Sequence, residues 1–136
     1  MTSGDAKTIV PLGTPQSQSA VSRAIDKLFA DGKEPIYPAI SRALDQLRVR
    51  NDPNRINAVV VLTDGGGTSV GLEELLGAIE DQTLTEGTTV RIFTVAYGKG
   101  RHVDALKQIA SASDGVFFPA GPKDIGDVYK TIYSYF

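Results

Sequence analysis

Hydrophobic positions along the chain repeat with two periods, one typical of strands and one typical of helices. Residues 58–63, AVVVLT, and 90–97, VRIFTVAY, are near-continuous apolar runs rich in β-branched side chains. Runs of this kind predict strands of a parallel sheet that are covered on both faces. Shorter runs at 7–12 and 116–118 predict two further strands, and Pro11 favours an edge or strand end for the first because it has no N–H to donate.

Elsewhere, apolar residues recur at intervals of three and four, which predicts amphipathic helices. The helical stripes are Val21, Ala24, Ile25, Leu28 and Phe29; Ile40, Ala43, Leu44 and Leu47; Leu72, Leu75, Leu76 and Ile79; Val103, Leu106, Ile109 and Ala110; and Ile125, Val128, Tyr129, Ile132 and Phe136. Strands and helices therefore alternate along most of the chain. This order predicts the α/β class: a doubly wound, mostly parallel, Rossmann-like sheet with helices on both faces, linked by right-handed crossovers.

Composition narrows the class of protein. The 136 residues are enough for one domain, 1–136, and 41% hydrophobic with 22% charged residues is a globular composition. A formal net charge of −2 gives no attraction to nucleic acid or to an anionic membrane. The absence of cysteine excludes disulfides, thiolate metal sites and a cysteine nucleophile. No apolar run approaches the length of a membrane span, and the first residues do not form a signal peptide.

Asp64 stands out because it follows the apolar run 58–63 and precedes Gly65, Gly66 and Gly67. In open parallel sheets, ligands bind beyond the carboxyl ends of the strands, which is where this order places Asp64. Its carboxylate suits a metal ligand, an acceptor for metal-bound water, a nucleophile, or a cap for the next helix. The glycines favour a binding role, because they let a ligand approach the backbone.

The sequence gives less support to an enzymatic function than to a binding function. Residues 65–71, GGGTSVG, lack the third glycine of GxGxxG, where Val70 stands, and lack the GK[ST] of a P-loop. A phosphoryl-transfer enzyme with Asp64 as nucleophile and Thr68 beside it is the best alternative, but the second acid that such chemistry needs is missing. The single histidine, His102, is typical of a solvated first helical turn, so no Ser–His–acid arrangement is predicted.

Four segments together resemble a von Willebrand factor type A domain. They are GKEPIYPAISRALDQL, NAVVVLTDGGGT, VRIFTVAYGKG and LKQIASASDGVFFPAGPKDIGDVYKTIYSYF, which occur in family order over residues 31–136. The similarity is strongest to bacterial members. It implies a doubly wound α/β fold and a non-enzymatic role in protein–protein binding or cell adhesion.

The resemblance also implies a metal-ion-dependent adhesion site at the carboxyl edge of the sheet. In the family, Mg²⁺ or Mn²⁺ is held by a DxSxS motif, a threonine and an aspartate, and an acidic group of the partner completes the coordination. A hard cation with oxygen ligands and several waters fits that donor set. Matched by position, the metal ligands here are Asp64 and Glu34, with Gly65, Gly66, Thr68 and Ser69 as ligand-binding neighbours.

The chain departs from the family pattern in two places. Glu34 stands where the threonine belongs, and in PQSQS, residues 15–19, Pro15 stands where the aspartate of DxSxS belongs. Either the chain is a fragment that lacks the first strand, which we favour, or its metal site is degenerate. In both cases we expect Mg²⁺ or Mn²⁺ to bind weakly or not at all.

A missing first strand would leave the strand at 58–63 with an open side. Open strand edges tend to pair with another chain. We therefore expect either that residues 7–12 fill the vacancy or that two chains self-associate. The expected function is protein binding at a degenerate or truncated adhesion site, with an Mg²⁺-dependent hydrolase using Asp64 as the alternative.

Overall fold

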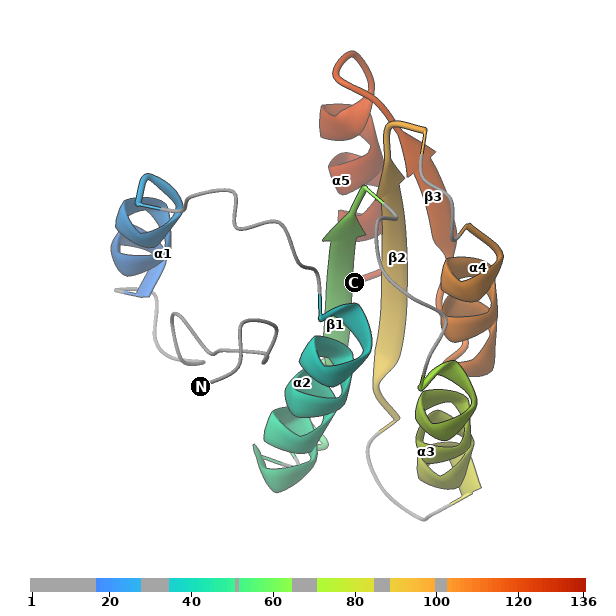
Figure 1. Ribbon diagram of the computed structural model, residues 1–136. Helices are drawn as coiled ribbons and strands as arrows, with labels where there is room; N and C mark the ends of the chain where they lie inside the picture. The colour runs from blue at the N-terminus through green and yellow to red at the C-terminus, as the bar shows by residue number, and fades with distance from the viewer. Residues whose placement is uncertain (1–16, 28–34, 51, 65–70, 85–88, 100–102) are drawn as a thin grey trace.

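The computed structural model describes residues 17–27, 35–50, 52–64, 71–84, 89–99 and 103–136. Five helices and three strands lie in this part of the chain (Figure 1). In chain order they are α1 (Ser17–Ile25), α2 (Ile36–Arg50), β1 (Ala58–Thr63), α3 (Leu72–Leu84), β2 (Arg91–Tyr97), α4 (Val103–Ala112), β3 (Phe117–Ala120) and α5 (Ile125–Tyr133). The predicted strand at 7–12 lies outside the described residues.

The three strands form one parallel sheet in the order β1-β2-β3. β1 pairs with β2 along its whole length, from Ala58 opposite Arg91 to Thr63 opposite Ala96. β3 pairs with the second half of β2, from Thr94 opposite Phe117 to Tyr97 opposite Ala120. The α/β class and the parallel sheet predicted from the alternation are confirmed.

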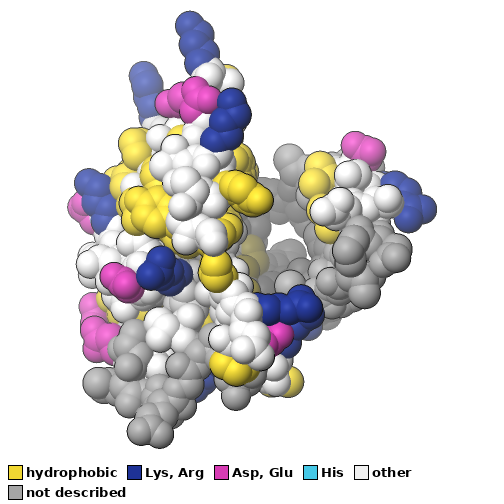
Figure 2. Space-filling model, turned by 180° about the vertical axis from the view of Figure 1, so that it is seen from behind, with side chains coloured by type: hydrophobic (Ala, Val, Ile, Leu, Met, Phe, Trp, Pro, Cys, Tyr) yellow, Lys and Arg dark blue, Asp and Glu magenta, His cyan; other side chains and the backbone are white. Residues whose placement is uncertain are grey.

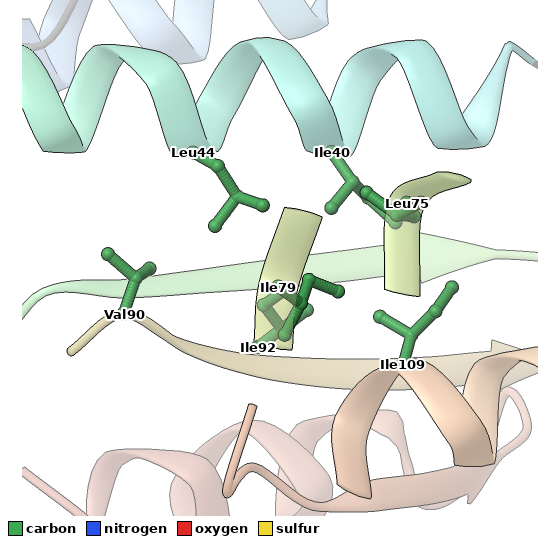
Figure 3. Packing of buried hydrophobic residues seen from close by; sticks show 7 residues of the cluster. All are labelled: Ile40, Leu44, Leu75, Ile79, Val90, Ile92 and Ile109. Atoms are coloured by element: carbon green, nitrogen blue, oxygen red, sulfur yellow. The ribbon is translucent and has the colours of Figure 1, made fainter. Parts of the chain in front are cut away.

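Helices α2, α3 and α4 cover one face of the sheet, called here the α2 face (Figure 1). Their apolar stripes meet the side chains that β1 and β2 direct to this side, and Figure 3 shows seven of these residues turned toward one another. The buried cluster consists of Ile40, Leu44, Leu75, Ile79, Val90, Ile92 and Ile109. Val59 and Val61 of β1 pack against it.

Helix α5 covers the opposite face, called here the α5 face. Ile132 of α5 packs with Phe93, Val95 and Ala120, which belong to β2 and β3. The ring of Phe93 also meets two aromatic rings from the end of the chain, Tyr135 at 5.4 Å and Phe136 at 5.8 Å between centroids. Helices therefore lie on both faces, as the sequence predicted.

The prediction that residues 58–63 are covered on both faces is wrong for the described part of the chain. Val60 is 40% exposed and Leu62 is 52% exposed. Both side chains lie on the α5 face, where α5 packs over β2 and β3 rather than over β1. β1 is thus buried on the α2 face and partly open on the other.

The end of one helix differs from the sequence prediction, and another helix stands apart from the sheet. The last helix ends at Tyr133 instead of reaching Phe136, and Ser134–Phe136 turn back toward Phe93. Helix α1 lies away from the sheet, on the β1 side (Figure 1). Within the described ranges, no helix has the length and apolar character needed to cross a membrane.

Candidate functional site at the carboxyl edge

The carboxyl ends of the three strands lie at one edge of the sheet because all three are parallel. β1 ends at Thr63, which is buried, and Asp64 follows it with an exposed side chain. Alternation along an extended chain accounts for the change from buried to exposed. The structure therefore places Asp64 on the rim of the sheet where the sequence predicted an acid, while its role there stays a prediction.

The ends of the other two strands are joined by backbone hydrogen bonds. Gly98 follows β2 with φ of +82°, a conformation that glycine adopts without a steric penalty. Its N–H donates to the carbonyl of Ala120 at 2.9 Å, which ties the end of β2 to the end of β3. The carboxylate of Asp124 accepts a hydrogen bond from the N–H of Gly121. Asp64 therefore follows β1 at an edge of the sheet where the ends of β2 and β3 are held together by a hydrogen bond.

Two lysines lie in the same region of the molecule. Lys99 comes directly after Gly98, and Lys123 lies in the turn between β3 and α5. Both side chains are exposed. In the described part of the chain, the strand ends and the β3–α5 turn therefore carry the acidic groups of Asp64 and Asp124 and the basic groups of Lys99 and Lys123.

A cavity of about 290 Å³ opens between the first turns of α2 and α3. Both helices run antiparallel to β1, so their first turns lie toward the carboxyl edge (Figure 1). The wall is mostly apolar, with one hydroxyl and one carboxylate from Ser41 and Glu74. The lining residues are Tyr37, Pro38, Ser41, Gly71, Glu74, Leu75 and Ala78.

Burial raises the pKa of the Tyr37 hydroxyl above its usual value, so this group is a neutral donor at physiological pH. Gly71 has φ of +91°, and a Cβ added there would lie 3.8 Å from the ring of Tyr37. The hydrophobic pattern of the sequence gives no indication of this cavity. The available signal was topological: two helices begin at the edge to which β1 leads.

The other predicted site residues cannot be compared with the structure. Glu34, Gly65, Gly66, Thr68, Ser69 and His102 all lie outside the described residues. In the ranges that the structure does describe, no group of three or more His, Cys, Asp or Glu side chains is placed to hold a metal ion. Of the two residues matched to the family's metal ligands, Asp64 lies in these ranges, and its role as a ligand stays a prediction.

Comparison with known proteins identifies the family. The model of the von Willebrand factor type A domain matches residues 1–131, and the chain belongs to this family. Members of the family generally act in protein interaction and adhesion, and they are typically not enzymes. The resemblance inferred from the sequence is therefore confirmed.

Two further comparisons are less informative. No curated protein matches the chain. Among solved structures, the chain is similar to an uncharacterized membrane-spanning protein from Vibrio fischeri, with 18% identity and a TM-score of 0.49. The match covers 87% of this chain and 66% of the other, so this chain spans slightly less than two thirds of that protein.

Proposed function

We propose that this chain binds a partner protein at the carboxyl edge of the sheet, through a metal-ion-dependent adhesion site that is degenerate or truncated, and that it is not an enzyme. The observation that carries the proposal is the position of Asp64. Its side chain is exposed and lies directly after a strand held in register with β2 over six residue pairs. A carboxylate held in this way is oriented before a ligand arrives, which lowers the entropic cost of binding.

The cavity beside the rim supports the proposal. Its volume of about 290 Å³ and its apolar wall are suited to one side chain of a partner, and the carboxylate of Glu74 and the hydroxyl of Ser41 supply polar contacts. Rigid pockets that accept a single anchoring side chain are typical of interfaces in which a few residues dominate affinity. We infer that this cavity and the Asp64 rim contact the same partner.

We propose that the partner contributes an acidic side chain. Lys99 and Lys123 are exposed at this edge and can attract a carboxylate directly. An acidic group would also complete the coordination of a cation if one were held weakly at Asp64. Mg²⁺ or Mn²⁺ would be that cation, and we propose that it binds weakly or not at all.

The test compares two aspartate substitutions that differ in location. Asp64→Asn removes the charge at the rim with little change in shape. Asp45→Asn is the matched control, because Asp45 lies on α2 in an exposed ion pair with Arg48 at 3.8 Å, and such pairs contribute little to stability. Each protein is immobilised and exposed to extract from its own host, and the retained proteins are identified.

We expect at least one protein to be retained by the wild type and by Asp45→Asn, and to be lost with Asp64→Asn. Identical retention by all three proteins would contradict the proposal. Each protein is also assayed with p-nitrophenyl phosphate and Mg²⁺. Turnover by the wild type that disappears with Asp64→Asn would establish the alternative, a Mg²⁺-dependent hydrolase or phosphoryl-transfer enzyme that uses Asp64.

A further inference from the structure

The wall of the cavity between α2 and α3 is formed by one side of each helix. On α2, Tyr37 and Ser41 are four positions apart. Gly71, which precedes α3, is followed by Glu74 and Ala78 at intervals of three and four. Side chains at these intervals lie on the same side of a helix. The packing of the two helices therefore fixes the position of these groups.

The cavity wall carries one charge, and that charge is negative. Pro38, Leu75 and Ala78 are apolar, and Glu74 is the acidic residue of the wall. Among the described residues that line the cavity, none is basic. The ion pairs that join described residues do not involve Glu74. A cationic group is the complementary occupant of such a wall.

Basic side chains are visible on the opposite side of the sheet. Figure 2 views the molecule from behind, and it shows Lys and Arg side chains at the upper end and hydrophobic side chains below them. The cavity lies on the α2 face, because α2 and α3 both cover that face. The sheet therefore separates the cavity from the basic groups seen in Figure 2.

We propose that this cavity receives an arginine side chain of the partner protein. The inference rests on the proposed function, and it adds a basic residue to the acidic one that the partner presents at the rim. The apolar wall suits the methylene groups of arginine, which pack against apolar surface while the charged end stays at the opening. The guanidinium donates to the carboxylate of Glu74 and to the hydroxyl of Ser41.

The ring of Tyr37 favours arginine over lysine. A Cβ added at Gly71 would lie 3.8 Å from the Cδ2 atom of this ring, so glycine leaves that part of the ring without a side chain beside it. A planar guanidinium stacks on an aromatic ring and donates to several acceptors at once. The ammonium of lysine is more strongly hydrated and gains less from such a wall.

The charges of the first turn of α3 disfavour an acidic occupant. This turn contains Glu73 and Glu74, which carry two negative charges. The N-terminus of a helix carries about half a positive charge, which is smaller. A carboxylate in the cavity would therefore be repelled.

The size of the cavity is suited to one long side chain. Its volume of about 290 Å³ lies just below the range of about 300–1,000 Å³ that is usual for small-molecule pockets. The Glu74 side chain is exposed, so water and salt weaken its attraction for a cation. We therefore expect an isolated arginine side chain to bind with a dissociation constant on the order of 1 mM.

The first experiment uses Nα-acetyl-arginine methylamide as the probe, with ¹⁵N-labelled protein and NMR. The probe should shift the amide signals of Ser41, Gly71 and Ala78 in a saturable way. The citrulline compound, which has nearly the same shape and no charge, should bind about threefold to fivefold more weakly. Glu74→Gln should weaken binding of the arginine compound by the same factor.

Glu73→Gln is the matched control, because Glu73 lies in the same turn of α3 but does not line the cavity. It should bind the probe like the wild type. Equal binding of the arginine and citrulline compounds, tighter binding of the lysine or glutamate compound, or no saturation at tens of millimolar would overturn the proposal. The comparison of compounds uses the wild type, so it holds even if a variant fails to fold.

The second experiment separates this inference from the proposed function. The arginine compound, added to the retention assay described above, should reduce the amount of the Asp64-dependent protein several-fold, and the citrulline compound should not. Asp64-dependent retention that the arginine compound leaves unchanged would overturn this inference alone. Retention that is identical with Asp64→Asn would overturn the proposed function, while saturable binding of the arginine compound would still establish the preference of the cavity.

Discussion

Gly115 is a residue at which one added carbon atom would meet the backbone. A Cβ built there would lie 1.9 Å from the carbonyl oxygen of Ile92 and 2.7 Å from its carbon. The close approach arises because the turn after α4 passes against the start of β2, and the N–H of Gly115 donates to the carbonyl of Ala110 at 2.8 Å. Glycine is required here for space.

We expect Gly115→Ala to lower the free energy of unfolding by about 2 kcal/mol or more, because the neighbouring atom is backbone and cannot rotate away. Denaturation in urea, followed by circular dichroism, measures the change. Gly126→Ala is the matched control: no atom lies within 4 Å of a Cβ added there, and alanine in a helix should stabilise by about 0.5–1 kcal/mol. Equal effects of the two substitutions would show that the turn does not approach Ile92 in solution.

At the scale of elements, one buried hydroxyl joins the end of α4 to the start of β2. The side chain of Ser113 is fully buried and accepts a hydrogen bond from the N–H of Ile92 at 2.9 Å. It also lies 3.0 Å from the carbonyl oxygen of Ala110, to which it can donate. β3 pairs with β2 only from Thr94 onward, so Ser113 supplies the acceptor that the strand lacks at Ile92.

Ser113→Ala should therefore destabilise the protein by about 1–3 kcal/mol, because a buried N–H is left without a partner. Hydrogen exchange at the amide of Ile92 should accelerate more than exchange at Val95, which lies farther along β2. The control is Ser134→Ala, whose hydroxyl bonds the carbonyl of Thr131 at an exposed position and should have little effect. Unchanged exchange at Ile92 would argue against the hydrogen bond.

The strands and helices of the described residues could largely be predicted from hydrophobic periodicity. AVVVLT coincides with β1, the runs at 90–97 and 116–118 fall on β2 and β3, and the stripes fall on the five helices, while the run at 7–12 lies outside the described residues. The exposure of Val60 and Leu62 could not be predicted. A β-branched run indicates that a strand can be buried on both faces, but it does not show whether other elements cover those faces. The end of α5 at Tyr133 was missed because Phe136 fits the helical spacing yet contacts Phe93 from a turn.

The candidate site was predictable only in part, for a similar reason. The position of Asp64 follows from one strand and the rule that ligands bind at the carboxyl edge. The cavity lined by Tyr37 and Glu74 requires two helices that are distant in sequence to begin side by side. The spacing of residues along the sequence does not show which helices begin side by side.

At the scale of the whole molecule, metal binding would appear as a change in stability. A cation that binds the folded state raises the melting temperature by mass action. We expect millimolar MgCl₂ or MnCl₂ to leave the melting temperature within experimental error of its value in KCl at the same ionic strength, because Pro15 and Glu34 stand where the family has an aspartate and a threonine ligand. Differential scanning fluorimetry makes the comparison, and tight, stoichiometric binding in calorimetry would falsify the expectation.

The contact of Phe93 with Tyr135 and Phe136 has a consequence for the order in which the chain folds during synthesis. β2 leaves the ribosome well before these two residues do, so the centre of the sheet stays accessible to chaperones and to water until translation of this region is nearly finished. Replacing Tyr135 and Phe136 together by alanine should therefore uncover Phe93 and increase the fluorescence of the dye ANS relative to the unaltered chain.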